Sequence, residues 1–378
     1  MKKIGIITFH NSYNCGSMLE SFAIHKYLLN QNIENEIIDF SNEGQKKLYA
    51  TSFPNNSIKN IVKNILILPH YGKIDKNNNK YEQFKNKNFK LSKKYKEDKE
   101  LEDSNYDLVI AGSDQIWNIT IEDSDDAYFL PWAKNSKKVA YAPSFGSKNI
   151  VKYTKDIKKY RSYLEDFDAL SVREKNGTKW IKELTNRDAE LLIDPTLLLD
   201  NIEYDNIMDN TNTPNYEYIF FYCPSFQTDI CKFVKKLAKK YKLPVITWST
   251  KSYYVKNVKR FGFKLPDYES PAVYLSLIKN ARLVLTTSFH GTIFSTIYKK
   301  DFITIKNGGM YGEDDRVLTL LEELKLTDRL IPYDFKEDFD YMKNVDYSEY
   351  DTNLKKLRDR AYKYIKNNVE DYYNETKK

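Results

Sequence analysis

The first forty residues carry the pattern that most restricts the fold. Residues 3–9 form a short apolar run rich in Ile, and a polar loop that contains Gly16 follows it. Apolar residues then recur at helical spacing, at Leu19, Phe22, Ala23 and Tyr27. A second apolar run covers residues 36–40. This order of strand, helix and strand predicts a β-α-β unit, and therefore a parallel sheet with helices on both faces.

The same alternation continues and then returns in the second half of the chain. Further strand patterns cover residues 107–111, 138–142, 169–172, 218–222, 244–248 and 283–287, and helical patterns cover 230–241, 272–279 and 292–298. A polar segment at 200–216, which contains Pro214, has the composition of a linker. The 378 residues also suit two domains better than one. We therefore predict a first domain at 1–200, with a Lys-rich helical insertion or lid at 73–105, a second domain at 215–350, and a terminal amphipathic helix at 351–378.

The composition limits the class of partner. The formal charge of +7 comes from 60 Lys and Arg against 53 Asp and Glu, and the Lys residues are mixed with acidic residues and Asn. Nucleic-acid binding usually needs a concentrated basic face, so we expect no nucleic-acid partner. The three cysteines lack a metal-ligand spacing and are expected to be reduced thiols. No apolar run suits a signal peptide or a membrane span, which predicts a cytoplasmic protein.

Two loops that follow predicted strands suit the binding of a sugar. Open parallel sheets bind their ligands at the carboxyl ends of the strands. In loop 10–17, Asn14 and Gly16 either contact a ligand at a helix start or only form the turn. Loop 112–118 combines a carboxylate, two amides and an indole, from Asp114, Gln115, Asn118 and Trp117. Carboxylates and amides bind vicinal hydroxyls, and an aromatic ring covers the apolar face of a sugar. In the alternative interpretation, Asp114 caps a helix and Trp117 lies in the core.

Two later loops suit the binding of an anion and the transfer of a proton. Arg173 follows a predicted strand, where it either holds a phosphate or carboxylate through two parallel hydrogen bonds or pairs with a neighbouring acid. His290 lies between strand 283–287 and the next helix, and His suits proton transfer near neutral pH. Ser288 and Gly291 flank it, and Gly291 is expected to leave the first-turn amides open to an anion. A buried structural histidine is the alternative.

Six segments together resemble the polysaccharide pyruvyl transferase family. They occur in the family's order, and the likeness extends from the start of the chain to about residue 326. The segments are 3–19, 112–118, 171–174, 194–196, 288–291 and 315–321. The sequence departs from the family pattern in two places: Glu20 stands where many members carry Gln, and segment 73–105 is biased toward Asn and Lys.

The resemblance implies a GT-B-like α/β fold, in which two Rossmann-type parallel-sheet domains face each other across a cleft. It also implies phosphoenolpyruvate as the donor and co-substrate, with no other cofactor and no metal. The family's donor contacts correspond to Arg173 and His290 and, less closely, to Arg316. The implied reaction forms a cyclic pyruvate ketal on a sugar of a bacterial surface polysaccharide or of its lipid-linked precursor.

The chemistry of the loops and the resemblance together predict a role for each candidate residue. His290 is the expected proton donor and Asp114 the group that binds or deprotonates the acceptor hydroxyls. The predicted donor-binding residues are Arg173, Ser288, His290, Gly291 and Arg316. The predicted acceptor-binding residues are Asn14, Gly16, Asp114, Gln115, Trp117 and Asn118.

Two other functions use the same predicted fold. One is a GT-B glycosyltransferase that takes a nucleotide sugar, and the other is a catalytically silent glycan-binding protein. The Lys-rich segment 85–99 is in addition a candidate for contact with an anionic membrane, which would place the protein at the inner face of that membrane. An ordinary solvated helix explains this segment equally well.

Overall fold

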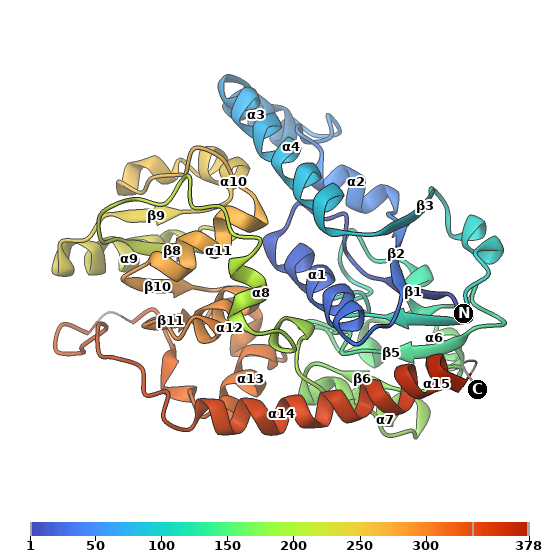
Figure 1. The fold of residues 1–378 in the computed structure, drawn as a ribbon. Helices are drawn as coiled ribbons and strands as arrows, with labels where there is room; N and C mark the ends of the chain where they lie inside the picture. The colour runs from blue at the N-terminus through green and yellow to red at the C-terminus, as the bar shows by residue number, and fades with distance from the viewer. Residues whose placement is uncertain (1, 335, 376–378) are drawn as a thin grey trace.

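A computed structural model describes residues 2–334 and 336–375, and two five-stranded parallel sheets form its two lobes (Figure 1). The strand order is β3-β2-β1-β4-β5 in the first sheet and β12-β11-β10-β8-β9 in the second. Both are Rossmann-type, doubly wound sheets. The first has the classic Rossmann strand order, and the second has its flavodoxin-like variant. The predicted α/β fold with two Rossmann-type sheets is therefore confirmed.

The first lobe begins with the predicted β-α-β unit. Its strands are β1 (Ile4–Ile7), β2 (Asn35–Phe40), β3 (Leu91–Tyr95), β4 (Leu108–Ala111) and β5 (Lys137–Ala140), and β6 (Ser171–Val172) pairs with β7 (Glu190–Leu191) beside them. Its helices are α1 (Cys15–Asn30), α2 (Glu43–Tyr49), α3 (Ile58–Ile67), α4 (Tyr71–Asn88), α5 (Ile150–Tyr153), α6 (Ile157–Glu165) and α7 (Lys175–Thr185). β1 lies at the centre of the first sheet, between β2 and β4, and all of its residues are buried. Its Ile6 lies opposite Ile37 on one side and Ile110 on the other.

The second lobe follows helix α8 (Asn201–Asp205). Its strands are β8 (Ile219–Tyr222), β9 (Val245–Thr247), β10 (Leu283–Thr286), β11 (Phe302–Ile305) and β12 (Leu330–Ile331). Its helices are α9 (Thr228–Tyr241), α10 (Thr250–Val255), α11 (Pro271–Asn280), α12 (Phe289–Ile297) and α13 (Arg316–Leu324). Side-chain caps start two of these helices: Ser270 accepts from the Val273 amide, and Ser288 accepts from the Gly291 amide.

The chain ends in a helix that spans both lobes. Helix α14 (Tyr350–Ile365) and the short α15 (Asp371–Asn374) run along one edge of the molecule back toward the first lobe (Figure 1). Tyr364 donates a hydrogen bond to the Ala140 carbonyl, and Arg358 donates to carbonyls of Leu197 and Leu199. The predicted amphipathic helix is thus present from Tyr350. The domain boundaries at 200 and 215 stay a prediction.

Segment 73–105 differs from the predicted insertion. Residues 91–95 form strand β3, which extends the first sheet beyond β2. Helix α4 buries Tyr81 and Phe84 in the main core, together with Phe89 just after it. Lys85 is buried as well, where it donates to Asn11 Oδ1 at 2.6 Å and pairs with Glu82 at 2.8 Å. The segment is therefore part of the sheet and core, and Lys85 cannot contact a membrane surface.

Candidate active site

The main cavity lies between the two lobes, at the carboxyl ends of both sheets. Its volume is about 640 Å³, which is within the usual range for small-molecule sites. Strand order reverses between β1 and β4 in the first sheet and between β8 and β10 in the second. The loops after these four strands line the cavity through Asn14, Asp114, Pro224 and Ser288. Two topological switch points therefore face each other, and this is where doubly wound folds bind ligands.

Arg173 forms the charged floor of this cavity. Its guanidinium is buried, and Nη1 donates to Asp194 Oδ2 at 2.5 Å. Nη2 lies 3.6 Å from Asp114 Oδ1, and the guanidinium stacks 4.4 Å from the centre of the Phe289 ring. Burial raises the pKa of the Asp194 carboxyl, but the charges of His290 and Arg173 outweigh it and hold that pKa well below its ordinary value. Asp194 is therefore an anion that holds Arg173 and contacts His290.

His290 enters the cavity from the first turn of α12. Its Nε2 lies 3.3 Å from Asp194 Oδ2, and only a small part of its surface is exposed. The imidazole packs on α1, where a Cβ atom at Gly16 would lie 2.2 Å from Nδ1. Gly16 is thus buried against His290, which gives it a packing role in place of the predicted contact with the acceptor.

The cavity floor contains buried donors whose hydrogen-bonding capacity is unused. Arg173 Nε and Nη2 have no hydrogen-bond partner among the described residues, and His290 Nε2 has only its 3.3 Å contact with Asp194. Buried polar groups in proteins are rarely left unpaired, because each one costs about 1–3 kcal/mol. Two unpaired donors on one buried guanidinium that lines the cavity indicate a site for an anion.

Arg316 lies on the wall of the same cavity, at the start of α13. It is held by Asp314, with Nε 2.8 Å from Oδ1 and Nη2 2.6 Å from Oδ2. Burial lowers the pKa of Arg316, but the carboxylates of Asp314 and Glu174 outweigh burial and raise it further above its ordinary value. The structure therefore brings Arg173, His290 and Arg316 to the lining of one cavity.

Ser288 and Gly291 shape the start of α12. Ser288 lines the cavity and caps the helix by accepting a hydrogen bond from the Gly291 amide. A Cβ atom at Gly291 would lie 2.3 Å from Thr286 Oγ1, so only glycine lets the helix approach the strand end this closely. The Gly291 amide is therefore used by the cap and is not open to an anion, and the predicted access to the first-turn amides is wrong for this one amide.

Asp114 lies at the junction between the cavity and the first lobe. Its Oδ2 accepts from Ser17 Oγ at 2.5 Å, and its Oδ1 accepts from the Gln115 amide at 2.8 Å. The backbone of Asp114 has φ of +69°, in the left-handed region that Asp adopts more readily than most residues. Gln115 also lines the cavity, as does Asn14, whose side chain caps α1 by accepting from the Gly16 amide. These three predicted residues do reach the cavity.

Trp117 and Asn118 do not take the predicted acceptor role. Trp117 is fully buried among Phe129, Phe145 and Phe167, and its indole N–H donates to the Tyr128 carbonyl at 3.2 Å. The Asn118 side chain is directed into its own loop, where it accepts from the Thr120 amide and hydroxyl. The prediction was wrong for both, because the Trp117 ring buries its apolar surface in the core and the Asn118 amide closes its own loop.

Four acidic residues near the cavity were not predicted as site residues. Asp194 holds Arg173, and Glu20 is buried beside it on α1. Burial, followed by the charges of Asp114 and Asp194, raises the pKa of Glu20 well above its ordinary value. Burial likewise raises the pKa of Glu174 to about 7 and that of Asp123 to about 6. Sequence signals existed for three of them: Glu174 and Asp194 lie in the family-like segments 171–174 and 194–196, and Glu20 departs from the family pattern.

Glu20, Asp194 and His290 also have the residue types of a metal site. One potential ligand atom from each lies within 4.8 Å of the others. Arg173 already donates to Asp194, however, and its positive charge lies where it would repel a cation. The arrangement suits an ion-pair network that binds an anion better than a metal centre.

The solved structures with similar architecture have the GT-B fold. A Listeria monocytogenes protein assigned as a UDP-N-acetylglucosamine 2-epimerase is 9% identical, with a TM-score of 0.52 over 98% of this chain and 97% of that one. Staphylococcus aureus MnaA, solved with UDP, is 13% identical, with a TM-score of 0.50 over 94% of this chain and 98% of that one. Two Rossmann-type lobes around a cleft place this protein in the GT-B fold class.

The family is shown by the sequence itself. The polysaccharide pyruvyl transferase family matches residues 14–309, which include every predicted site residue except Arg316. The chain belongs to the polysaccharide pyruvyl transferase family. No curated protein matches the chain. None of the helices in the described part of the chain has the length and apolar composition needed to cross a membrane.

Proposed function

We propose that this protein transfers pyruvate from phosphoenolpyruvate to a sugar of a bacterial surface polysaccharide or its lipid-linked precursor, where the pyruvate forms a cyclic ketal. The observation that carries the proposal is the pair of unpaired donors on Arg173 at the floor of the main cavity, with His290 beside them. Phosphoenolpyruvate has two anionic groups, and Arg316 supplies a second guanidinium on the same wall. Membership of the family supports the transfer of pyruvate to a polysaccharide.

In the proposed reaction, His290 donates a proton to the terminal CH2 of phosphoenolpyruvate. The double bond then supplies the electron pair for the new C–H bond, and C2 becomes electrophilic. The first acceptor hydroxyl adds to C2, and the proton of this hydroxyl returns to His290, directly or through a relay group. Arg173 and Arg316 hold the phosphate and carboxylate and stabilise the charge that develops as phosphate leaves. The second hydroxyl closes the ketal, and its proton is released with the phosphate, so the products are the ketal and inorganic phosphate.

Asp114 is the proposed group that binds or deprotonates the acceptor hydroxyls. It lines the cavity with one carboxylate oxygen near Arg173 and the other on Ser17. Phosphoenolpyruvate is the co-substrate, and the scheme needs no metal and no other cofactor. Two neighbouring hydroxyls on the acceptor are a chemical requirement of ketal formation.

Thermal-shift measurements on the full chain test the donor. Phosphoenolpyruvate at a hundred times its Kd is expected to stabilise the fold by about 2.7 kcal/mol, whereas UDP-, GDP- and CMP-sugars are expected to have no effect. Inorganic phosphate serves as the control for simple anion binding. Stabilisation by a nucleotide sugar alone would favour the glycosyltransferase alternative, and stabilisation by neither would favour a silent glycan-binding protein.

His290→Ala tests the chemistry. Proton transfer by a positioned side chain is typically worth about 10²–10⁴-fold in rate, so the variant should lose turnover by at least that factor. The measurement is phosphate release together with a mass increase of the glycan. The melting temperature should change little, because the His290 side chain borders the cavity and not the hydrophobic core. A folded variant with normal pyruvyl transfer would contradict the mechanism.

The proposal includes contact with the inner face of an anionic membrane, where a lipid-linked acceptor would be found. Helix α3, which projects at one end of the molecule beside α4, supports it (Figure 1). Five of its apolar residues have exposed fractions between 45% and 81%: Ile58, Ile61, Val62, Ile65 and Leu66. Lys59 is exposed on the same helix, and this combination suits an anionic bilayer.

Sedimentation with phosphatidylglycerol vesicles tests this contact. The wild type should sediment with them and should not sediment with phosphatidylcholine vesicles. The double variant Ile58→Ser/Ile65→Ser should lose binding, whereas Ile202→Ser, which changes an equally exposed isoleucine on α8, should not. Equal sedimentation of all three proteins, or dimerisation that depends on Ile58 and Ile65, would contradict a membrane role for α3.

A further inference from the structure

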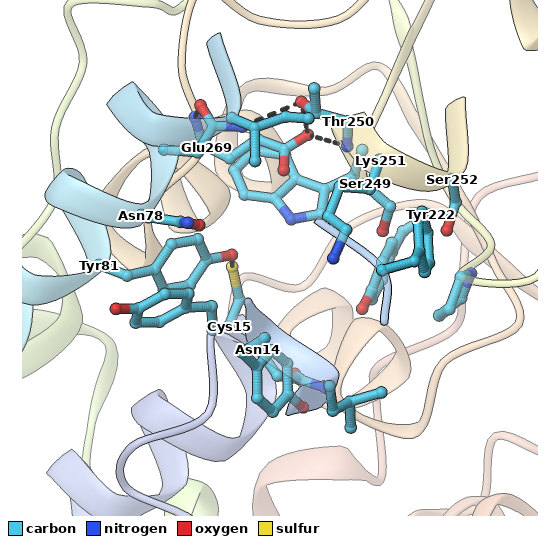
Figure 2. A pocket seen from close by; sticks show the side chains of 18 residues that line it. Asn14, Cys15, Asn78, Tyr81, Tyr222, Ser249, Thr250, Lys251, Ser252 and Glu269 are labelled. Atoms are coloured by element: carbon cyan, nitrogen blue, oxygen red, sulfur yellow. Dashed lines mark hydrogen bonds between the residues drawn. The ribbon is translucent and has the colours of Figure 1, made fainter. Parts of the chain in front are cut away.

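A second cavity of about 340 Å³ opens beside the main one, between the same two lobes (Figure 2). Asn14, Tyr49 and Tyr222 line both cavities, so the two adjoin each other. The first lobe contributes residues from loop 13–15, α2 and α4, and the second contributes the loop after β9 and Glu269. None of the predicted site residues except Asn14 lines this second cavity.

Aromatic side chains form much of its wall. Tyr13 and Tyr81 stack with ring centres 5.5 Å apart, and the Tyr81 hydroxyl lies 3.0 Å from the sulfur of Cys15. Trp248 lies on the wall from the second lobe and is braced by Tyr274. Aromatic rings held in this way cover the apolar face of a sugar ring.

Polar groups from both lobes are held in place beside the aromatic wall. Glu269 Oε1 accepts from the amide and the hydroxyl of Thr250, at 2.9 and 2.8 Å (Figure 2). Asn77 on α4 joins this network, because it accepts from the Glu269 amide and donates to Thr250. Asn78 adds a second amide to the lining. A carboxyl and two amides next to aromatic rings are the groups that bind vicinal hydroxyls.

The Glu269 carboxyl can also change its hydrogen-bonding role. Burial raises its pKa to about 7, although hydrogen bonds from Thr250 lower it. A carboxyl that holds its proton can donate to one hydroxyl and accept from another. The side chain is fixed by Thr250, so its orientation toward a ligand is set before binding.

We infer that this second cavity binds the acceptor sugar ring, which stacks on its aromatic wall and hydrogen-bonds to Glu269 and Asn78. The inference rests on the proposed function, because it assumes a donor in the main cavity. A sugar placed here directs hydroxyls past Asn14 and Tyr222 toward the main cavity, where Arg173 and His290 lie. This cavity also supplies the acceptor contacts that were predicted for Trp117 and Asn118 and that these two residues cannot make.

The test measures binding of p-nitrophenyl hexopyranosides of the gluco, galacto, manno and N-acetylated series to the full chain by titration calorimetry. The wild type should bind at least one of them. Glu269→Gln and Asn78→Ala should each weaken that binding at least tenfold and leave the thermal shift by phosphoenolpyruvate unchanged. Glu322→Gln, which changes an exposed carboxyl on α13, is the matched control and should bind normally.

The outcomes separate this inference from the proposed function. If the wild type responds to phosphoenolpyruvate and its hexoside binding is unaffected by Glu269→Gln and Asn78→Ala, or no hexoside binds, the subsite is overturned and the donor proposal stands. If a hexoside binds in a way that depends on Glu269 and Asn78 but phosphoenolpyruvate gives no shift, the subsite stands and the donor proposal fails. Loss of the phosphoenolpyruvate shift in both variants would also overturn the subsite.

Discussion

A Cβ atom at Gly16 would lie 2.2 Å from Nδ1 of His290 and 2.6 Å from its Cγ, so the two residues are in direct contact between the lobes. Gly16 belongs to the first turn of α1, and its amide is held by Asn14 at 2.9 Å. His290 belongs to the first turn of α12 in the other lobe. The missing side chain at position 16 therefore lets the imidazole lie between α1 and Asp194.

Gly16→Ala should displace His290 and lower turnover by about 10² or more, the range for loss of a positioned proton donor. Phosphate release at saturating donor is the measurement. Gly72→Ala is the matched control, because a Cβ there meets nothing within 4 Å and Ala is the better helix former. Normal turnover of Gly16→Ala would show that the position of His290 is not needed.

Arg173→Lys should raise the KM for phosphoenolpyruvate at least tenfold, with a smaller effect on kcat. Lys keeps the charge but lacks the planar set of donors that can reach Asp194 and a ligand at once. Initial rates at varied donor concentration measure the change. An unchanged KM would remove Arg173 from the donor site.

Trp117→Ala should destabilise the fold by about 3–5 kcal/mol, as expected for a large side chain removed from a packed core. Denaturant unfolding measures this loss. Trp117→Phe should remain folded and bind hexosides as well as the wild type does. If Trp117→Phe is as stable as the wild type but binds hexosides more weakly, Trp117 contacts the acceptor and the core assignment is wrong.

Glu20→Gln should make the protein more stable relative to the wild type as the pH rises. Burial and the charges of Asp114 and Asp194 raise the pKa of Glu20 in the folded state. The folded chain therefore holds a proton that the unfolded chain releases above its ordinary pKa of 4.5, and wild-type stability falls as the pH rises above that value. Gln cannot ionise, so the variant lacks this loss.

Denaturant unfolding of both proteins at pH 5 and pH 8 tests this prediction. The difference in free energy of unfolding should favour the variant more at pH 8. A difference that is the same at both pH values would show that Glu20 is not protonated in the folded chain.

Much of the fold could be predicted because its signals are local. The Ile-rich run of β1, the helical spacing of α1 and the strand patterns of β8 and β10 each depend on neighbouring residues. β3 was not predicted, because its sequence LSKKY is polar. The strand lies at the edge of the first sheet, where part of it is exposed to solvent.

Two parallel-sheet halves and the loops at their strand ends follow from local sequence patterns, and Arg173 and His290 indicate an anion site. Which loop side chains enter the cavity depends on tertiary packing. Trp117 turns into the core, whereas Asp114, three positions earlier, faces the cleft. Asp194 and Glu20 join His290 although 174 residues separate the first two. Local periodicity specifies helices and strands, but contacts between distant segments depend on how the two lobes pack, and no local pattern carries that information.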